Sequence, residues 1–154
     1  MISRILPLLL LSLVIVCGCD NPKQQDPPDL GRGGSGVSAM QHYFVTNNPG
    51  KEVIKYGYKD LNNDGQEDLV VIYRVSKDKN MMRAILTSMG GYLATNEVPA
   101  PVSNQRVEFR DIDQKPPMEF IVQGMKGTKV GYAVFRIENG RIVDLFGEGM
   151  ADCC

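Results

Sequence analysis

Apolar residues near the start of this chain form one continuous run. Ile5 to Val16 comprises 12 residues, and only Pro7 and Ser12 interrupt the run. Because a membrane-spanning helix needs about 20 apolar residues, this run is too short to cross a bilayer. Arg4 precedes it and a Pro/Gly-rich polar stretch follows it, so the run indicates an export signal that is removed from the mature chain.

Beyond position 50, apolar residues come in short β-branched or aromatic runs separated by turn residues, and this pattern predicts strands. Asn139-Gly140 lies between two runs and is a strong signal for a two-residue hairpin. Before the strands, Ser38 opens a capping-box pattern, and a short helix is predicted over Ala39–Thr46. The predicted strands are Val53–Lys59, Leu69–Val75, Arg83–Ser88, Arg106–Arg110, Phe120–Met125, Val130–Ile137 and Ile142–Phe146.

The strand-rich region contains an internal repeat. Tyr56–Val71 aligns with Val107–Val122 at an offset of 51 residues. After a two-residue slip, Met82–Gly91 aligns with Gly131–Gly140. This self-similarity predicts two copies of a strand–loop–strand–hairpin unit.

The loop of the first copy has the composition of a calcium site. "DLNNDGQEDL" (Asp60–Leu69) places oxygen-bearing side chains at positions 1, 3, 5 and 9, with Gly65 allowing the turn. It resembles the metal loop of FG-GAP/VCBS-type repeats; an EF-hand is disfavoured because Val71 occupies position 12. The alternative is a tight turn with solvated acids. In the second copy Lys115 and Pro116 break the pattern, so that copy is expected to be structural. The candidate calcium ligands are Asp60, Asn62, Asp64, Gln66 and Asp68.

These patterns predict a mainly β, small α+β fold. It has two FG-GAP-like β repeats in one compact domain, with a short helix at its start. A propeller ring wants about four or more blades, so two copies cannot close one. The expected parts are a lipoprotein signal peptide over residues 1–18, a flexible tether over 19–37, the two-repeat domain over 38–146, and a flexible tail ending in Cys-Cys over 147–154.

The cysteines of this chain lie only near its two ends. "VCGC" (Val16–Cys19) resembles the bacterial lipoprotein box, which implies that Cys19 becomes the lipidated first residue on the extracytoplasmic face of the cell membrane. Cys17 would leave with the signal, so Cys153 and Cys154 remain as thiols. Adjacent Cα atoms lie about 3.8 Å apart, closer than disulfides prefer. The pair therefore suits an external partner, and thiolates favour soft metal ions.

Composition excludes several function classes. The formal net charge is −1, and a nucleic-acid partner would call for a basic patch. His42 is the only histidine, so a zinc site of histidines or a Ser-His-Asp triad would rest on one residue. No acid/base pair stands apart from turn and ligand roles, and no enzymatic activity is expected.

The two ends of the chain together resemble a known family. "VCGC" at one end and "DCC" at the other are similar to the Cys-Cys-COOH (seleno)protein SaoC family of lipoproteins, some of whose members end in Cys-Sec. The resemblance implies capture of a soft metal or organometal cation, such as mercury, by Cys153 and Cys154. It also implies handover to an ABC-type transporter, alongside an organomercurial lyase-like protein, in a detoxification system. The alternatives are a thiol redox lipoprotein and a calcium-stabilised surface binding module.

Overall fold

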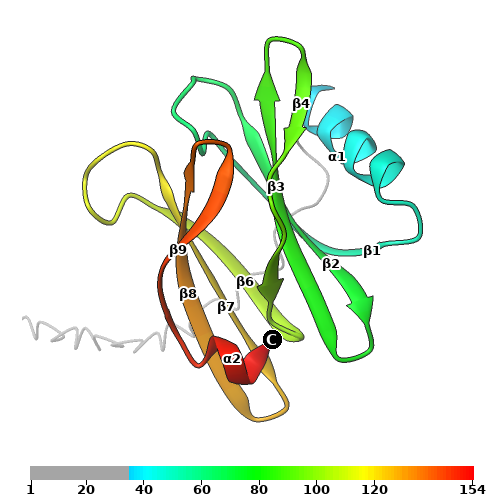
Figure 1. Cartoon of the computed structure of the whole chain (residues 1–154), viewed down its shortest axis with the longest axis vertical. Helices are drawn as coiled ribbons and strands as arrows, with labels where there is room; N and C mark the ends of the chain where they lie inside the picture. Colours follow the sequence, from blue (N-terminus) through cyan, green and yellow to red (C-terminus); the bar gives the residue numbers. More distant parts are fainter. Residues whose placement is uncertain (1–34) are drawn as a thin grey trace, which may run out of the picture.

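Two antiparallel sheets pack face to face, and one helix covers the outside of the first sheet (Figure 1). The structure is a computed structural model that describes residues 35–154, without the side chains of residues 35–38, 151 and 153. The predicted signal peptide and most of the predicted tether, with Cys17 and Cys19, lie outside the described residues. The elements are α1 (Ser35–Asn47), β1 (Glu52–Lys59), β2 (Asp68–Ser76), β3 (Lys79–Ser88), β4 (Gly91–Ala94), β5 (Val98–Ala100), β6 (Ser103–Arg110), β7 (Glu119–Lys126), β8 (Lys129–Glu138), β9 (Arg141–Glu148) and α2 (Met150–Cys153).

Each sequence repeat forms its own sheet. The first sheet has the order β1-β2-β3-β4, and the second has the order β6-β7-β8-β9. In the first sheet, β4 pairs with β3 at Ile85–Ser88 and β5 pairs with β3 at Asn80–Met82, so two short strands share one edge. The prediction of a mainly β fold with a helix at its start is confirmed.

The main core lies between the two sheets. Val70 and Ile72 of β2 pack there with Phe120, Val122 and Phe135 of the second sheet. Because successive side chains of a strand point to opposite faces, the intervening residues of β2 face the other way, toward α1. The apolar run of β2 is continuous because both faces of this strand are buried.

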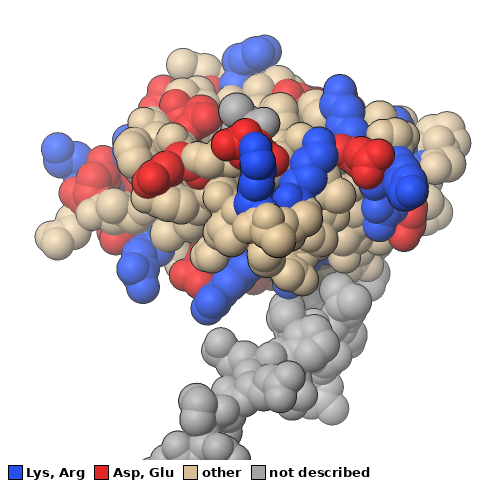
Figure 2. Space-filling model, turned by 90° about the horizontal axis from the view of Figure 1, so that it is seen from below, with Lys and Arg blue, Asp and Glu red and all other residues tan. Residues whose placement is uncertain are grey.

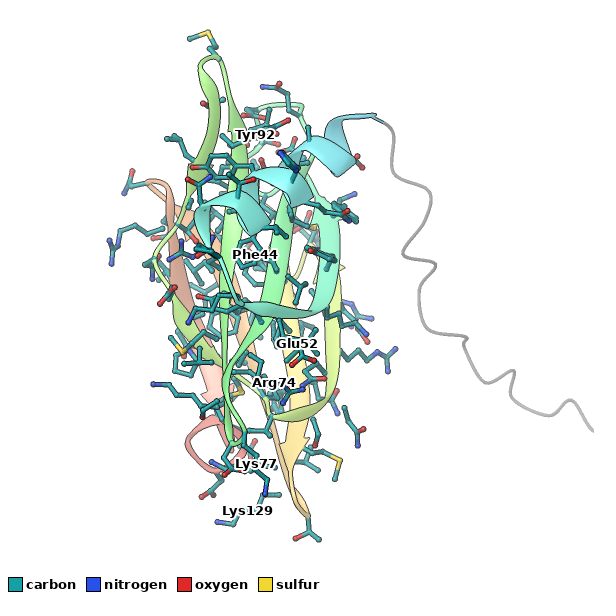
Figure 3. All side chains as sticks on the ribbon, turned by 90° about the vertical axis from the view of Figure 1, so that its right-hand side faces the viewer. Phe44, Glu52, Arg74, Lys77, Tyr92 and Lys129 are labelled. Atoms are coloured by element: carbon teal, nitrogen blue, oxygen red, sulfur yellow. The ribbon has the colours of Figure 1, made fainter. Side chains whose placement is uncertain are left out.

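A second core lies between α1 and the outer face of the first sheet. Met40 and Phe44 of the helix pack on Leu69, Val71 and Tyr73 of β2. Figure 3 shows α1 lying across this face, with Phe44 at the contact. The outer face of the second sheet carries no helix among the described residues (Figure 1).

Several elements differ from the prediction, among them β3 and β6, which begin at Lys79 and Ser103 rather than at Arg83 and Arg106. Helix α1 begins at Ser35 rather than near Ala39, so the predicted domain start at residue 38 falls inside the helix. Strands β4 and β5 were not predicted. β4 has only four residues, and β5 contains Pro99, which lacks the N–H that a central strand needs. Pro99 is tolerated because β5 pairs with β3 alone.

The tail prediction over residues 147–154 needs correction. β9 continues to Glu148, and Met150–Cys153 then forms the short helix α2. Gly149 makes the turn between them with φ +66°, and a Cβ there would lie 2.5 Å from the carbonyl oxygen of Val130. The Met150 side chain packs against the inter-sheet core. The end of the chain is therefore seated on the domain.

Candidate functional site

The first loop is held by its own acidic side chains. Asp60 Oδ1 accepts the Asn63 N–H at 2.7 Å, and Asp60 Oδ2 accepts the Gly65 N–H at 2.9 Å. Asp64 Oδ1 accepts the Gln66 N–H at 2.9 Å, and Asn62 Oδ1 accepts the Asp64 N–H at 3.0 Å. Because a carboxylate oxygen has more than one lone pair, these bonds order the loop without using up its capacity to bind a cation.

Asp68 closes the first loop from inside the protein. Its side chain is fully buried, Oδ2 accepts the Leu61 N–H, and Oδ1 accepts the Thr87 N–H, each at 2.9 Å. Burial raises the pKa of Asp68 to about 6; the two N–H bonds oppose this rise, and the charges of Asp64 and Asp60 add to it. A bound cation would favour the ionised carboxylate and so offset the cost of burying it.

The second loop keeps the same closure. Glu119 aligns with Asp68, is buried, and its Oε2 accepts the Ile112 N–H at 2.8 Å, just as Asp68 accepts the N–H of Leu61. In both loops the donor and the acid are seven residues apart. This shared bond identifies the two loops as structural equivalents.

Arg136 supplies a positive charge to the second loop. Its Nη2 lies 2.7 Å from Asp113 Oδ2 and 2.5 Å from Glu119 Oε1. Burial works against the charge, but the two carboxylates outweigh it and raise the pKa of Arg136. Burial also opposes ionisation of Asp113, yet the bond from Arg136 lowers the pKa of that carboxyl. The guanidinium of Arg136 thus neutralises these acids, as a bound cation would.

Sequence reasoning missed this cluster. Asp111, Asp113 and Glu119 are the one group of three metal-ligating residues, within the part of the chain that the structure describes, whose ligand atoms all lie within 4.8 Å of one another. The sequence does contain a signal for this cluster, because acids occupy positions 1, 3 and 9 of the second loop. Lys115 and Pro116 interrupt the calcium-loop pattern, and the second loop was therefore predicted to be structural. The acids of the first loop are not gathered so closely, and no ion pair among the described residues involves Asp60, Asp64 or Asp68.

The tail forms a second candidate site at the opposite end of the domain from the two loops (Figure 1). The Cys154 thiol donates toward the Met150 thioether, with 4.0 Å between the sulfurs. The Cys153 side chain lies outside the described residues. A cavity of about 320 Å³ adjoins the tail. It is lined by Val98, Pro99, Phe135, Asp144, Met150 and Cys154.

Two lysines that flank the β7–β8 turn contact the tail. Lys129 Nζ lies 2.9 Å from Asp152 Oδ1, and Lys126 Nζ donates to the main-chain oxygen of Cys154 at 3.2 Å. Figure 3 places Lys129 at the same end of the molecule as Lys77. Figure 2 views this end and shows basic and acidic residues interspersed.

Comparison of this chain with models of protein families, with curated proteins and with solved structures gave no match. Among the helices of residues 35–154, none has the length and apolar character needed to cross a membrane.

The first loop gives a prediction on calcium. Calcium should raise the melting temperature of the metal-free protein, because a ligand that binds only the folded state adds about 2.7 kcal/mol at 100 times its Kd. Asp64→Ala should abolish the rise, whereas Asp111→Ala, at the equivalent loop's first position, should retain it. Melting curves recorded with calcium and with a chelator measure both. A wild-type curve that calcium leaves unchanged would show that the loop is only a turn.

The second loop gives a prediction on Arg136. In an Asp64→Ala background, which removes the first loop's response, Arg136→Gln should lower the melting temperature in chelator by about 5 °C or more, because Glu119 stays buried without its counter-charge. Calcium should then restore part of the loss, since three carboxylates are left to bind it. Loss of stability with no calcium response would contradict the role of Arg136 as the loop's fixed cation.

Proposed function

We propose that this chain is an extracytoplasmic lipoprotein, anchored to the membrane through Cys19, that captures a soft metal or organometal cation with Cys153 and Cys154. The cation is of the mercury type, and the protein passes it to a transport and detoxification system. The resemblance of the chain's two ends to the SaoC family suggests an ABC-type transporter and an organomercurial lyase-like protein as partners.

The observation that carries this proposal is the sulfur pair in the tail. The Cys154 thiol and the Met150 thioether are 4.0 Å apart, and Cys153 is the adjacent residue of the chain. Thiolate and thioether groups prefer soft ions over calcium or magnesium. The lysine contacts to Asp152 and Cys154 hold these groups at one place on the domain. Capture by thiols needs no catalytic acid or base.

The contrast between the loops favours a second role, as a calcium-stabilised module. One loop has its acids neutralised by Arg136, and the equivalent loop has four acids with no basic partner among the described ion pairs. Calcium at the first loop would supply the missing charge. This role is compatible with metal capture, because the loops and the tail lie at opposite ends of the domain (Figure 1).

Mercury binding tests the proposal directly. The reduced protein, purified from membranes in detergent, should bind one Hg(II) per chain through its tail thiols. The double variant Cys153→Ser, Cys154→Ser should lose this ion, because serine oxygens are poor ligands for soft metals. Native mass spectrometry counts the bound ions. Both proteins are identical outside positions 153 and 154, so the difference reports the tail alone.

The matched control for folding is the melting temperature of the same double variant. Its free energy of unfolding should differ from that of the wild type by no more than about 0.5 kcal/mol, because serine is close in size to cysteine and Cys154 is only partly buried. Calorimetry of each single variant should show weaker binding of Hg(II) than in wild type, with methylmercury less affected because it needs one thiolate. Equal Hg(II) binding by the double-serine protein would refute capture by the tail.

Lipidation tests the anchor. Cells fed a radioactive fatty acid should label the wild-type protein, and Cys19→Ala should remove the label and leave an uncleaved or soluble form. Cys17→Ala is the matched control and should keep the label, because bulky Val16 precedes Cys17 where the lipoprotein box wants a small residue. An unlabelled wild type would exclude the lipoprotein interpretation.

A further inference from the structure

The cavity beside the tail is lined by residues from both sheets and from the short helix α2. β5 contributes Val98 and Pro99, β8 contributes Phe135, and α2 lies next to them with Met150 and Cys154. Near this side, the Asn96 side chain pairs with both the N–H and the carbonyl of Ile142, so it ties the first sheet's edge to β9. The tail therefore packs beside a cavity that the sheets leave between them.

The walls of this cavity are mostly apolar. Val98 and Met150 pack against the inter-sheet core, and Phe135 belongs to it. The volume is about 320 Å³. Apolar cavities of about 150 Å³ stay dry and bind benzene, so this one has room for a small aromatic group. The polar residues among those that line the cavity are Cys154 and Asp144.

The tail's position depends on Gly149. Its φ of +66° is one that side-chain-bearing residues rarely adopt, and an added Cβ would meet the Val130 carbonyl oxygen at 2.5 Å. Val130 belongs to β8, whose backbone is fixed by pairing with both neighbours. Any larger residue at position 149 would move α2 away from the cavity.

From this arrangement, and resting on the proposed capture of a soft cation by the tail, we infer that the cavity is a subsite for an apolar group carried by that cation. The thiol of Cys154 holds the metal at the edge of the cavity, and the metal's organic substituent lies against Val98, Pro99 and Phe135. A bare ion gains nothing from these walls. An aryl-substituted cation gains from removing apolar surface from water, so the site selects by the size of the substituent.

Loading of the site is a ligand exchange. The Cys154 thiol gives its proton to solvent, a sulfur–mercury bond forms, and the chloride that came with the organomercurial leaves. The mercury–carbon bond stays intact and no electrons are transferred. When the exchange is measured against a free thiol, the strength of the mercury–sulfur bond is the same on both sides. Any remaining preference of the protein for one organomercurial over another therefore reports contacts with the cavity.

The test uses phenylmercury chloride and methylmercury chloride, each equilibrated between the full protein and free cysteine. The wild type should prefer phenylmercury over methylmercury by about tenfold relative to free cysteine, the size expected when part of a ring is removed from water. Gly149→Ala should lose this preference while keeping both tail cysteines and still binding Hg(II). Gly90→Ala is the matched control, because a Cβ there has no atom within 4 Å.

A second variant tests the cavity without changing the tail, so that a misfolded tail cannot explain the result. Val98→Phe fills the cavity from β5, and should reduce phenylmercury binding to the level of methylmercury with Hg(II) binding unchanged. Equal ratios for wild-type protein and free cysteine would overturn the subsite and leave capture by the tail intact. If the double-serine variant still bound every mercury species, both proposals would be overturned. The failure of the subsite and the failure of capture by the tail are therefore distinguishable.

Discussion

One hydrogen-bonded acid at the start of the second strand of each repeat organises both halves of this domain. Asp68 and Glu119 are buried, and each accepts the N–H of the second residue of its loop, Leu61 or Ile112. Leaving such an N–H unpaired inside the protein would cost about 1–3 kcal/mol. Each bond therefore fixes the loop to the sheet. In the first loop it does so at the inter-sheet core, to which Leu61 belongs, whereas Ile112 of the second loop is 47% exposed.

The two copies diverge in how they balance the charge of that acid. Asp68 is short and takes its second bond from the Thr87 N–H, so its charge stays without a basic partner. Glu119 is longer and pairs with Arg136, the residue that aligns with Thr87 in the repeat. Because burying a carboxylate is costly, Arg136 balances the charge in the second copy, whereas the first copy would gain from an added cation. Divergence after duplication would thus leave one structural loop and one loop suited to an ion.

The sequence predicted the parts of the fold that depend on local pattern. Strand runs, the Asn139-Gly140 hairpin and the repeat were readable because alternation and turn chemistry are local, and both hairpin residues have the positive φ that this turn requires. β5 was missed because Pro99 argues against a strand, and only its edge position permits it. The seating of the tail was missed for another reason: Gly149 fits against Val130, a contact between residues whose proximity depends on the finished sheet.

The seating of the tail changes what a pair of thiols can do. Two cysteines on an unattached tail would bind any soft ion with equal access, because nothing beyond sulfur would touch the ligand. Here Lys126 and Lys129 hold the tail from one side and Met150 packs into the domain from the other. For the proposed capture of a cation, part of the cost of ordering the tail would then be borne by the fold rather than at each binding event. In the proposed complex, a ligand bound to Cys154 would also contact the cavity residues of β5 and β8, so the packing of the protein would contribute to discrimination among cations and sulfur to their affinity.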